Sequence, residues 1–426
     1  MRRHMPAFSG TSRADQATET ELEHATKTPL EIITKADVLV AGSLAIDLSC
    51  DFAPAEANTT TPALQTSNRA VIGQSLGGVG HSVAIAARYL DSSVLFCSVV
   101  GDDLSGQAAL SSLRQEGLST AGIKVLPPSS GARTAQYIAV NDAKKDLVVA
   151  MADMAIMELP EQALDFDNFW EPMMSRAQPQ WAVVDGNWND EVLSKWVSLA
   201  KKHKARVAFE PVSTAKSRRL FRSAIKPPDC VPNNTVSLAA PNQFELAAMY
   251  QAARENGHLD SEEWWRIIDA MGMTGSGSRE RLVAMTSATL VDQGIPQQSI
   301  QLLPFIPCVL TKLGREGVLL TQLLRPGDAR LTSPESAPYI LSRALTSDGL
   351  IGGVYLRLFP AAAELDEKDI VSVNGAGDTL LGAVVTGLAR GGAVEEVIPR
   401  AQEASVLTLQ QEGGVSKEIS RLAGSI

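Results

Sequence analysis

An alternation of short apolar runs with helical stretches constrains the fold of this chain more than any other feature. Apolar runs that are typical of buried strands lie at residues 36–42, 94–100, 181–184, 206–209, 236–240, 308–311 and 317–320. Helices are expected at residues 81–90, 105–116, 190–203, 377–389 and 394–409. Such alternation predicts a mainly parallel sheet covered by helices, which is an α/β fold.

This alternation is interrupted between residues 122 and 151. Short β-prone runs at 123–125, 134–140 and 146–151 follow one another there, with no room for crossover helices. We expect a small sheet projecting from the main body, with its lid strands mainly within 46–75 and 122–151. Residues 325–350 predict an elaborated loop. Residues 1–36 have no periodicity and predict a disordered N-terminal segment ahead of a single domain at 37–426.

Composition excludes some functions. The 426 residues carry a net charge of −10 and only 5% aromatic residues, which argues against nucleic-acid binding as the main function. No apolar run approaches the length of a membrane span, and the first residues lack the apolar region of a secretory signal. The four cysteines form no C-x-x-C pair, so we expect free thiols in a reducing compartment and a cytoplasmic protein.

The strongest motif lies at residues 371–382, where a β-prone run passes through a glycine turn into a helix. Backbone amides at Gly375, Ala376 and Gly377 can surround an anion at the helix N-terminus. Asp378 can then accept a proton from an attacking hydroxyl while the amides neutralise the charge on a transferred phosphoryl group. The alternative is a simple helix start, because aspartate is favoured near helix N-termini.

Two further features suggest a site for a polyhydroxylated ligand. The glycines of Gly77-Gly78-Val79-Gly80 precede a helix and let the backbone pass close to a ligand, although they also suit a flexible turn. Asp47 follows the first expected strand, where a carboxylate can accept hydrogen bonds from ligand hydroxyls. An aspartate there is otherwise a turn residue.

Other candidates are more ambiguous. Asn242 and Glu245 form N-x-x-E at an expected helix start, which suits either a helix cap or a magnesium shell. Residues 311–317 join two strands and could be no more than a hairpin turn. The chain has no Walker A sequence, and its five histidines are scattered, so a P-loop kinase and a histidine-based hydrolase are disfavoured.

Taken in order, these motifs resemble those of the ribokinase-like (PfkB) carbohydrate kinases from about residue 37 to 418. The motifs are Gly42 with Asp47, Gly77-Gly78-x-Gly80, Gly101-Asp102, Asn242-x-x-Glu245, Thr311-x-x-Gly314-x-x-Gly317 and Gly375-Ala376-Gly377-Asp378. The resemblance implies a three-layer α/β/α sandwich with a small β-sheet lid. It also implies ATP as phosphoryl donor and Mg²⁺ as cofactor. Whether a monovalent cation such as K⁺ is an additional cofactor stays open. The resemblance implies an anion hole at Gly375–Gly377, Asp378 as base, and Glu245 and Asn242 at the metal. The residues that it implies at the nucleotide are Asn242, Thr311, Gly314, Gly317 and Asn374.

Within that family the chain is most similar to the pseudouridine kinases. The similarity lies in residues 77–82, 133–142, 151–154, 210–216 and 407–410. It implies transfer of phosphate to the 5′-hydroxyl of pseudouridine. In fungi such kinases are fused to a pseudouridine-5′-phosphate glycosidase, and this chain is too short for that second enzyme, so we expect the kinase half or a stand-alone version. Family members also suggest a homodimer formed through the lid.

The resemblance places particular residues at the nucleoside. Asp47, Gly77 and Gly78 would hold the ribose, and Thr134 and Tyr137 would face the nucleoside from a lid strand. Ser82 stands where the family usually has an asparagine that binds sugar hydroxyls, and Asn374 stands where it usually has threonine.

Two alternatives to a pseudouridine kinase stay open. The first is a kinase for ribose, adenosine or another nucleoside. The second is a catalytically inactive family member with a regulatory role, which the presence of Gly375, Gly377 and Asp378 argues against.

Overall fold

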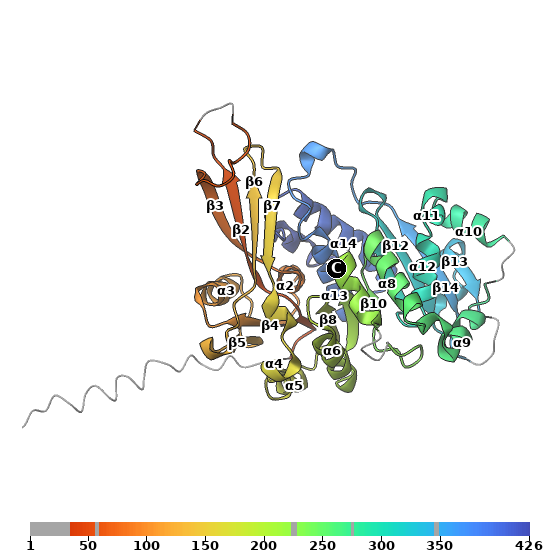
Figure 1. The fold of residues 1–426 in the computed structure, drawn as a ribbon. Helices are drawn as coiled ribbons and strands as arrows, with labels where there is room; N and C mark the ends of the chain where they lie inside the picture. The colour runs from red at the N-terminus through yellow and green to blue at the C-terminus, as the bar shows by residue number, and fades with distance from the viewer. Residues whose placement is uncertain (1–34, 56–58, 223–227, 274–276, 345–348) are drawn as a thin grey trace, which may run out of the picture. The chain divides into compact units, whose positions relative to one another are not determined.

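The large sheet of this protein has ten strands in the order β13-β14-β12-β11-β10-β9-β8-β1-β4-β5 (Figure 1). The structure of the protein is a computed structural model, which describes residues 35–55, 59–222, 228–273, 277–344 and 349–426. Residues 33–426 form one compact unit. The expected disordered segment at 1–36 lies almost entirely outside the described residues.

Seven neighbouring strands of the large sheet are parallel, as the alternation predicted. They are β5 (Ile123–Leu126), β4 (Val94–Gly101), β1 (Val38–Ala41), β8 (Trp181–Asp185), β9 (Arg206–Glu210), β10 (Leu238–Ala239) and β11 (Cys308–Lys312). Three antiparallel strands extend the sheet beyond β11. These are β12 (Val318–Leu324), β14 (Gly353–Phe359) and β13 (Ile340–Arg343).

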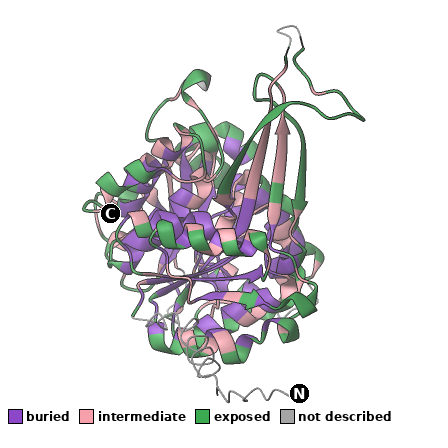
Figure 2. Ribbon diagram, turned by 90° about the vertical axis from the view of Figure 1, so that its left-hand side faces the viewer, coloured by how far each residue is buried: buried purple, intermediate pink, exposed green. Residues whose placement is uncertain are grey.

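Helices cover both faces of this sheet, which makes a three-layer α/β/α sandwich and confirms the predicted fold class. Successive residues of a strand point to opposite faces, so Leu39 and Ala41 join one core while Val38 and Val40 join the other. Figure 2 shows the buried residues, in purple, inside the molecule and the exposed outer faces of the helices in green. No helix among the described residues has both the length and the apolar character to cross a membrane.

Each core has its own set of helices. The core of Val38 is closed by α2 (Val79–Tyr89), α3 (Leu104–Gln115), α13 (Ala376–Ala389) and α14 (Val394–Leu409). The core of Leu39 is closed by α4 (Glu161–Leu164), α5 (Phe166–Ala177), α6 (Asp190–Lys202), α8 (Gln243–Glu255), α9 (Glu262–Ala270), α10 (Ser278–Met285), α11 (Ala288–Asp292) and α12 (Ile295–Leu302). The short helix α7 (Thr214–Ser217) follows β9.

A second sheet, here called the lid sheet, has four strands in the order β3-β2-β6-β7 and stands apart from the large sheet (Figure 1). Its strands are β2 (Ala45–Phe52), β3 (Ala70–Gly77), β6 (Gln136–Asn141) and β7 (Leu147–Asp153). Asp47 is paired with Ser75 and Tyr137, so these three side chains share one face. On the other face, Ile72 and Met151 are both 66% exposed.

Some sequence expectations for strands were wrong. The run at 123–125 belongs to β5, which pairs with β4 in the large sheet and not with the lid strands. Burial explains this placement, because Ile123 and Leu126 enter the main core. Thr134 precedes β6 and is not on a lid strand.

Two loop regions also differ from expectation. The β-prone residues 371–373 form no strand, and Val371 and Val373 are 52% and 71% exposed. No sheet partner lies beside them, so their β propensity is not used. The expected loop at 325–350 contains β13, which pairs with β14 at the edge of the large sheet.

Candidate active site

The carboxyl ends of five neighbouring strands meet at one edge of the large sheet. Chain connections run from β1 to β4 and β5 in one direction and through β8, β9, β10 and β11 in the other, so the strand order reverses between β1 and β8. Ligands bind in open α/β sheets at such reversal points, outside the carboxyl ends of the strands. Here this edge carries Ser43 after β1, Asp185 at the end of β8, Glu210 at the end of β9 and Lys312 at the end of β11.

Glycines bring the start of α2 against the end of β1. A Cβ atom at Gly42 would lie 2.5 Å from Oδ2 of Asp185, and one at Gly80 would lie 2.5 Å from the carbonyl carbon of Gly42. Gly78 has a φ of +97°, which L side chains rarely adopt. These glycines therefore let the start of α2 approach the end of β1 closely.

Asp185 ties these elements together. Its carboxylate accepts hydrogen bonds from the Ser43 amide at 2.8 Å, the Ser43 hydroxyl at 3.1 Å and the Asn187 amide at 3.0 Å. The Ser43 hydroxyl in turn accepts from the Val79 amide at 3.0 Å. Burial raises the pKa of Asp185, although these hydrogen bonds oppose the shift. The network holds the β1 end, β8 and α2 in one fixed arrangement.

Asp378 lies in the first turn of α13, whose N-cap is Gly375. Gly375 has a φ of +75°, and a Cβ atom there would lie 1.6 Å from the carbonyl oxygen of Gly414. The amides of a helix's first turn have no carbonyl partner within the helix, so those of Ala376 and Gly377 are suited to an anion. The Ser82 hydroxyl of α2 donates a hydrogen bond to the Asp378 carboxylate.

Burial of the Asp378 carboxyl group prepares it to bind a proton. Burial raises its pKa to about 7, and Asp185 and Glu245 add to this effect. Lys312 and the hydrogen bond from Ser82 act in the opposite direction and favour the carboxylate. A carboxyl group with a pKa near 7 can exchange a proton with a ligand at neutral pH.

Lys312 and Glu210 form a buried ion pair beside the same helix. The Lys312 Nζ atom lies 3.1 Å from each carboxylate oxygen of Glu210, whose side chain is 3% exposed. Burial raises the pKa of Glu210, against the effect of Lys312. Burial alone would lower the pKa of Lys312, but Glu210, Glu245 and Asp378 outweigh it and raise that pKa.

Asn242 and Glu245 form a complete capping box at the start of α8. The Asn242 side chain accepts from the Phe244 and Glu245 amides at 2.9 Å, and Glu245 Oε2 accepts from the Asn242 amide at 2.8 Å. Among the described residues, no cluster of three or more His, Cys, Asp or Glu side chains could hold a metal ion. If Mg²⁺ binds here, these two residues would contact it through its water molecules.

The other predicted nucleotide residues lie around the β11–β12 hairpin or before α13. Gly314 and Gly317 have φ values of +60° and +93° in the hairpin turn, which the Leu313 amide closes by donating to Gly317 O at 2.9 Å. Thr311 is fully buried, and its hydroxyl has no hydrogen-bond partner among the described residues. Asn374 is exposed directly before Gly375.

The two candidate lid residues, Thr134 and Tyr137, have different environments in the structure. Tyr137 is 37% exposed and shares a sheet face with Asp47. Burial raises the pKa of Asp47, and the nearby His81 lowers it. Thr134 is fully buried, and its hydroxyl donates to Asp103 at 2.7 Å and accepts from the Gly101 amide at 3.0 Å. Thr134 thus fixes the turn after β4 and offers no free group to a nucleoside.

Sequence reasoning missed Asp185, Glu210 and Lys312 as site residues. Asp185 and Glu210 each end an apolar run, in the same way as Asp47 follows one, and this was a usable signal. Lys312 had no such signal, because it lies within residues 311–317, whose glycines indicate only a turn between two strands.

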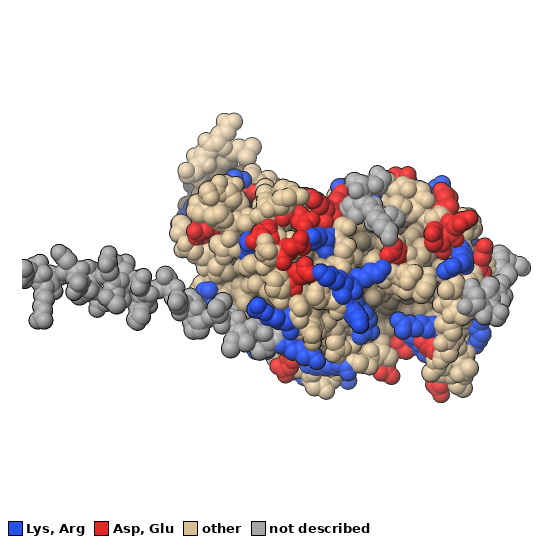
Figure 3. All heavy atoms as spheres, turned by 90° about the horizontal axis from the view of Figure 1, so that it is seen from below, with Lys and Arg blue, Asp and Glu red and all other residues tan. Residues whose placement is uncertain are grey.

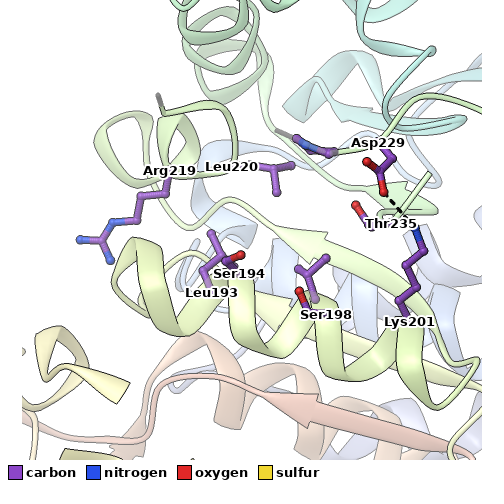
Figure 4. Close-up of a pocket in the computed structure, with 10 residues that line it drawn as sticks. Leu193, Ser194, Ser198, Lys201, Arg219, Leu220, Asp229 and Thr235 are labelled. Carbon is purple, nitrogen blue, oxygen red and sulfur yellow. Dashed lines mark hydrogen bonds and ion pairs between the residues drawn. The ribbon is translucent and has the colours of Figure 1, made fainter. Parts of the chain in front are cut away.

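Two surface features lie away from these residues. A hollow of about 190 Å³ lies beside α6, and Figure 4 shows the ion pair of Lys201 with Asp229 at one side of it. None of the site residues lines this hollow. The face in Figure 3 carries groups of Lys and Arg side chains and groups of Asp and Glu side chains close to one another.

Comparison with solved structures identifies the fold. The fold matches ribokinase from Cryptococcus neoformans in complex with ADP, with a TM-score of 0.58, 15% identity and coverage of 92% of this chain and 99% of that one. It also matches Arabidopsis thaliana ribokinase complexed with ribose and ATP, with a TM-score of 0.57, 14% identity and coverage of 92% and 100%. The fold is therefore ribokinase-like.

The family follows from the sequence match. The model of the pfkB family carbohydrate kinases matches residues 35–267 and 359–420. This chain belongs to that family, whose members are phosphotransferases with an alcohol group as acceptor. It is 27% identical over 395 residues to the pseudouridine-metabolizing bifunctional protein of Schizosaccharomyces pombe, which covers 91% of this chain. The chain spans about half the length of that relative, 48%.

Proposed function

We propose that this chain is an ATP-dependent kinase that phosphorylates the 5′-hydroxyl of pseudouridine. The observation that carries the proposal is Asp378, a carboxyl group with a pKa raised to about 7 beside the glycine turn at the start of α13. A group of this kind can take the proton of an attacking alcohol, and the neighbouring amides can stabilise a phosphoryl group. The acceptor is inferred from the fission-yeast relative, which is named for pseudouridine metabolism.

In the proposed reaction, the 5′-hydroxyl oxygen attacks the γ-phosphorus of ATP and its proton passes to Asp378. The bond from the γ-phosphorus to the bridging oxygen breaks, and ADP leaves with that oxygen. The amides of Gly375, Ala376 and Gly377 bind the oxygens of the transferred group. Ser82 keeps the Asp378 carboxylate oriented through its hydrogen bond.

Substrate contacts come from β2 and the start of α2. Asp47 would accept hydrogen bonds from ribose hydroxyls, and a Cβ atom at Gly77 would lie only 2.0 Å from Oδ2 of Asp47, so glycine there preserves the space of its carboxylate. Gly78 would let the backbone reach the sugar, and Tyr137 would face it from the lid sheet. Closure of the lid sheet would exclude water and so suppress ATP hydrolysis.

The donor site is proposed to lie around Asn242, the β11–β12 hairpin and Asn374. The ADP and ATP complexes of the two ribokinases support ATP as donor. Glu245 would hold Mg²⁺ through a water molecule, and the metal would neutralise charge on the phosphates. K⁺ stays a candidate as an additional cofactor.

A panel of acceptors tests this function. ADP release would be measured with ATP and Mg²⁺ and with pseudouridine, uridine, adenosine or ribose in turn. We expect kcat/KM for pseudouridine to exceed that for each of the others by at least about tenfold, because a site built to bind hydroxyl and N–H groups rejects ligands that leave them unpaired. A preference for ribose would overturn the choice of acceptor but not the kinase assignment.

The raised pKa of Asp378 predicts a pH dependence. Only the carboxylate form can accept the proton, and this form is lost as the pH falls through about 7. We therefore expect kcat/KM to fall about tenfold per pH unit below that point and to level off above it. A pH–rate profile with pseudouridine measures this limb, and a profile that is flat from pH 5 to 8 would contradict the assignment.

The exposed face of the lid sheet supports a homodimer. Ile72 and Met151, both 66% exposed, lie there with Val149, which is 43% exposed. Pairing across the sheet places all three on the face opposite Asp47. We propose that two copies associate through this apolar face, which measurement of the mass in solution by sedimentation tests directly. A monomer at micromolar concentration would contradict it.

A further inference from the structure

The Lys312 side chain lies beside the first turn of α13, next to the proposed anion hole. If Gly377 carried a Cβ atom, it would lie 3.1 Å from the Lys312 Nζ atom, so the ammonium group faces the first turn of α13. The backbone of Lys312 is held in place. Its amide donates a hydrogen bond to Pro241 O at 2.8 Å, and the residue forms an isolated parallel β-bridge with Asn242. The cation therefore lies beside the start of α13, at the end of a strand whose backbone is held in place.

The charges around this cation are mostly negative. Lys312 interacts with Glu210, Glu245 and Asp378, and Asp378 also interacts with Asp185. Lys216 donates to the Asn187 side chain at 2.5 Å, on the Asp185 side of the site. A polyphosphate that approaches Asp378 would meet these carboxylates, and Lys312 can offset their repulsion.

We propose that Lys312 is a further catalytic residue, whose ammonium group binds the transferring phosphoryl group beside the amides of Gly375, Ala376 and Gly377. This inference rests on the proposed kinase function. Glu210 holds the ammonium group in position through two contacts of 3.1 Å, so the cation is aimed at the anion hole before the nucleotide arrives. A cation fixed in this way stabilises charge in the transition state without reorganisation.

The alternative is a structural role, in which Lys312 merely neutralises the buried Glu210. The two roles predict different orders of kcat among three variants, which are Lys312→Met, Glu210→Gln and the double variant. When one partner of a buried ion pair is removed, the other charge is left uncompensated, whereas removal of both is often tolerated. A structural role therefore predicts that the double variant is more active than either single one.

Our proposal predicts a different order, in which Glu210→Gln is the most active of the three variants. We expect kcat for pseudouridine at saturating ATP to fall about 100-fold or more in Lys312→Met and in the double variant, because both lack the cation. Glu210→Gln keeps the cation and should lose far less. A double variant with kcat within about threefold of Glu210→Gln would overturn the proposal, and thermal unfolding of all three variants shows whether each is folded.

A binding measurement tests the same contact without turnover. Beryllium fluoride with ADP and Mg²⁺ mimics the γ-phosphoryl group, and its gain in affinity over ADP alone can be measured by calorimetry. We expect this gain to fall at least about tenfold in Lys312→Met and in the double variant and to persist in Glu210→Gln. An unchanged gain in the double variant would overturn the proposal. If the unmodified protein phosphorylates no acceptor, the proposed function fails, and the fluoride measurement still decides whether Lys312 binds the phosphoryl mimic.

Discussion

The Asp378→Asn variant should lose about three orders of magnitude in kcat, because its amide cannot accept the proton of the attacking hydroxyl. The amide is close to the carboxyl group in size and can still accept the hydrogen bond that Ser82 donates. Substrate affinity should therefore change little. Steady-state kinetics with pseudouridine and ATP measures both quantities, and near-normal turnover in the variant would show that another group is the base.

Thermal unfolding provides a control for this variant. Because the pKa of Asp378 is raised from 3.8 to about 7, its ionisation costs more in the folded than in the unfolded protein. The folded protein therefore loses stability as the pH rises from about 4 to about 7. The Asp378→Asn variant does not lose this stability, because asparagine does not ionise. At pH 8 we expect a Tm for Asp378→Asn that is equal to or above that of the unmodified protein, so misfolding would not explain the lost turnover.

The Gly375→Ala variant should lose about 100-fold in kcat and also be less stable, since both the backbone angle and the space at this position require glycine. A φ of +75° costs an L residue about 1–2 kcal/mol. In addition, the new Cβ atom would lie 1.6 Å from Gly414 O, so the helix start and the loop at Gly414 cannot keep their present positions. The amides of the anion hole would shift with them.

Gly391 offers a matched control for the backbone angle. It has a φ of +88° just beyond the far end of α13, and no atom of the described residues lies within 4 Å of a Cβ atom built there. Gly391→Ala should lower the Tm through the same angular cost while leaving kcat close to normal. If kcat fell equally in both variants, the loss would come from general destabilisation and not from displacement of the anion hole.

Much of this architecture could be predicted because local patterns encode it. The apolar runs of β1, β4, β8 and β9 and the helix α14 lie close to where periodicity placed them. The glycine turn before Asp378 is likewise a local feature. The β5 strand was assigned to the wrong sheet because a run of four residues carries no information about its partner, and only burial of Ile123 and Leu126 decides it.

The charged residues of the site are harder to predict. Asp185, Glu210 and Lys312 are far apart in the sequence, and the order of the parallel strands brings them to one edge. Asn242 and Glu245 show the converse difficulty. Their spacing suits both a cap and a metal shell, and only the observed hydrogen bonds show that the cap forms. In both cases tertiary contacts, which a short motif does not contain, determine the environment of the side chain.

The close packing of α13 on α2 has a consequence for how such an enzyme can diversify. A Cβ atom at Gly382 would lie 2.7 Å from the Ala86 Cβ atom, so the two helices are in direct contact over small residues. The helix of the proposed base and the helix of the proposed sugar site thus move as one body. The lid sheet is joined to this body at its strand ends, and the face that carries Asp47, Ser75 and Tyr137 can accumulate substitutions without displacing the reacting groups. New acceptors can therefore arise by mutation of the lid sheet while the chemistry at Asp378 is inherited unchanged.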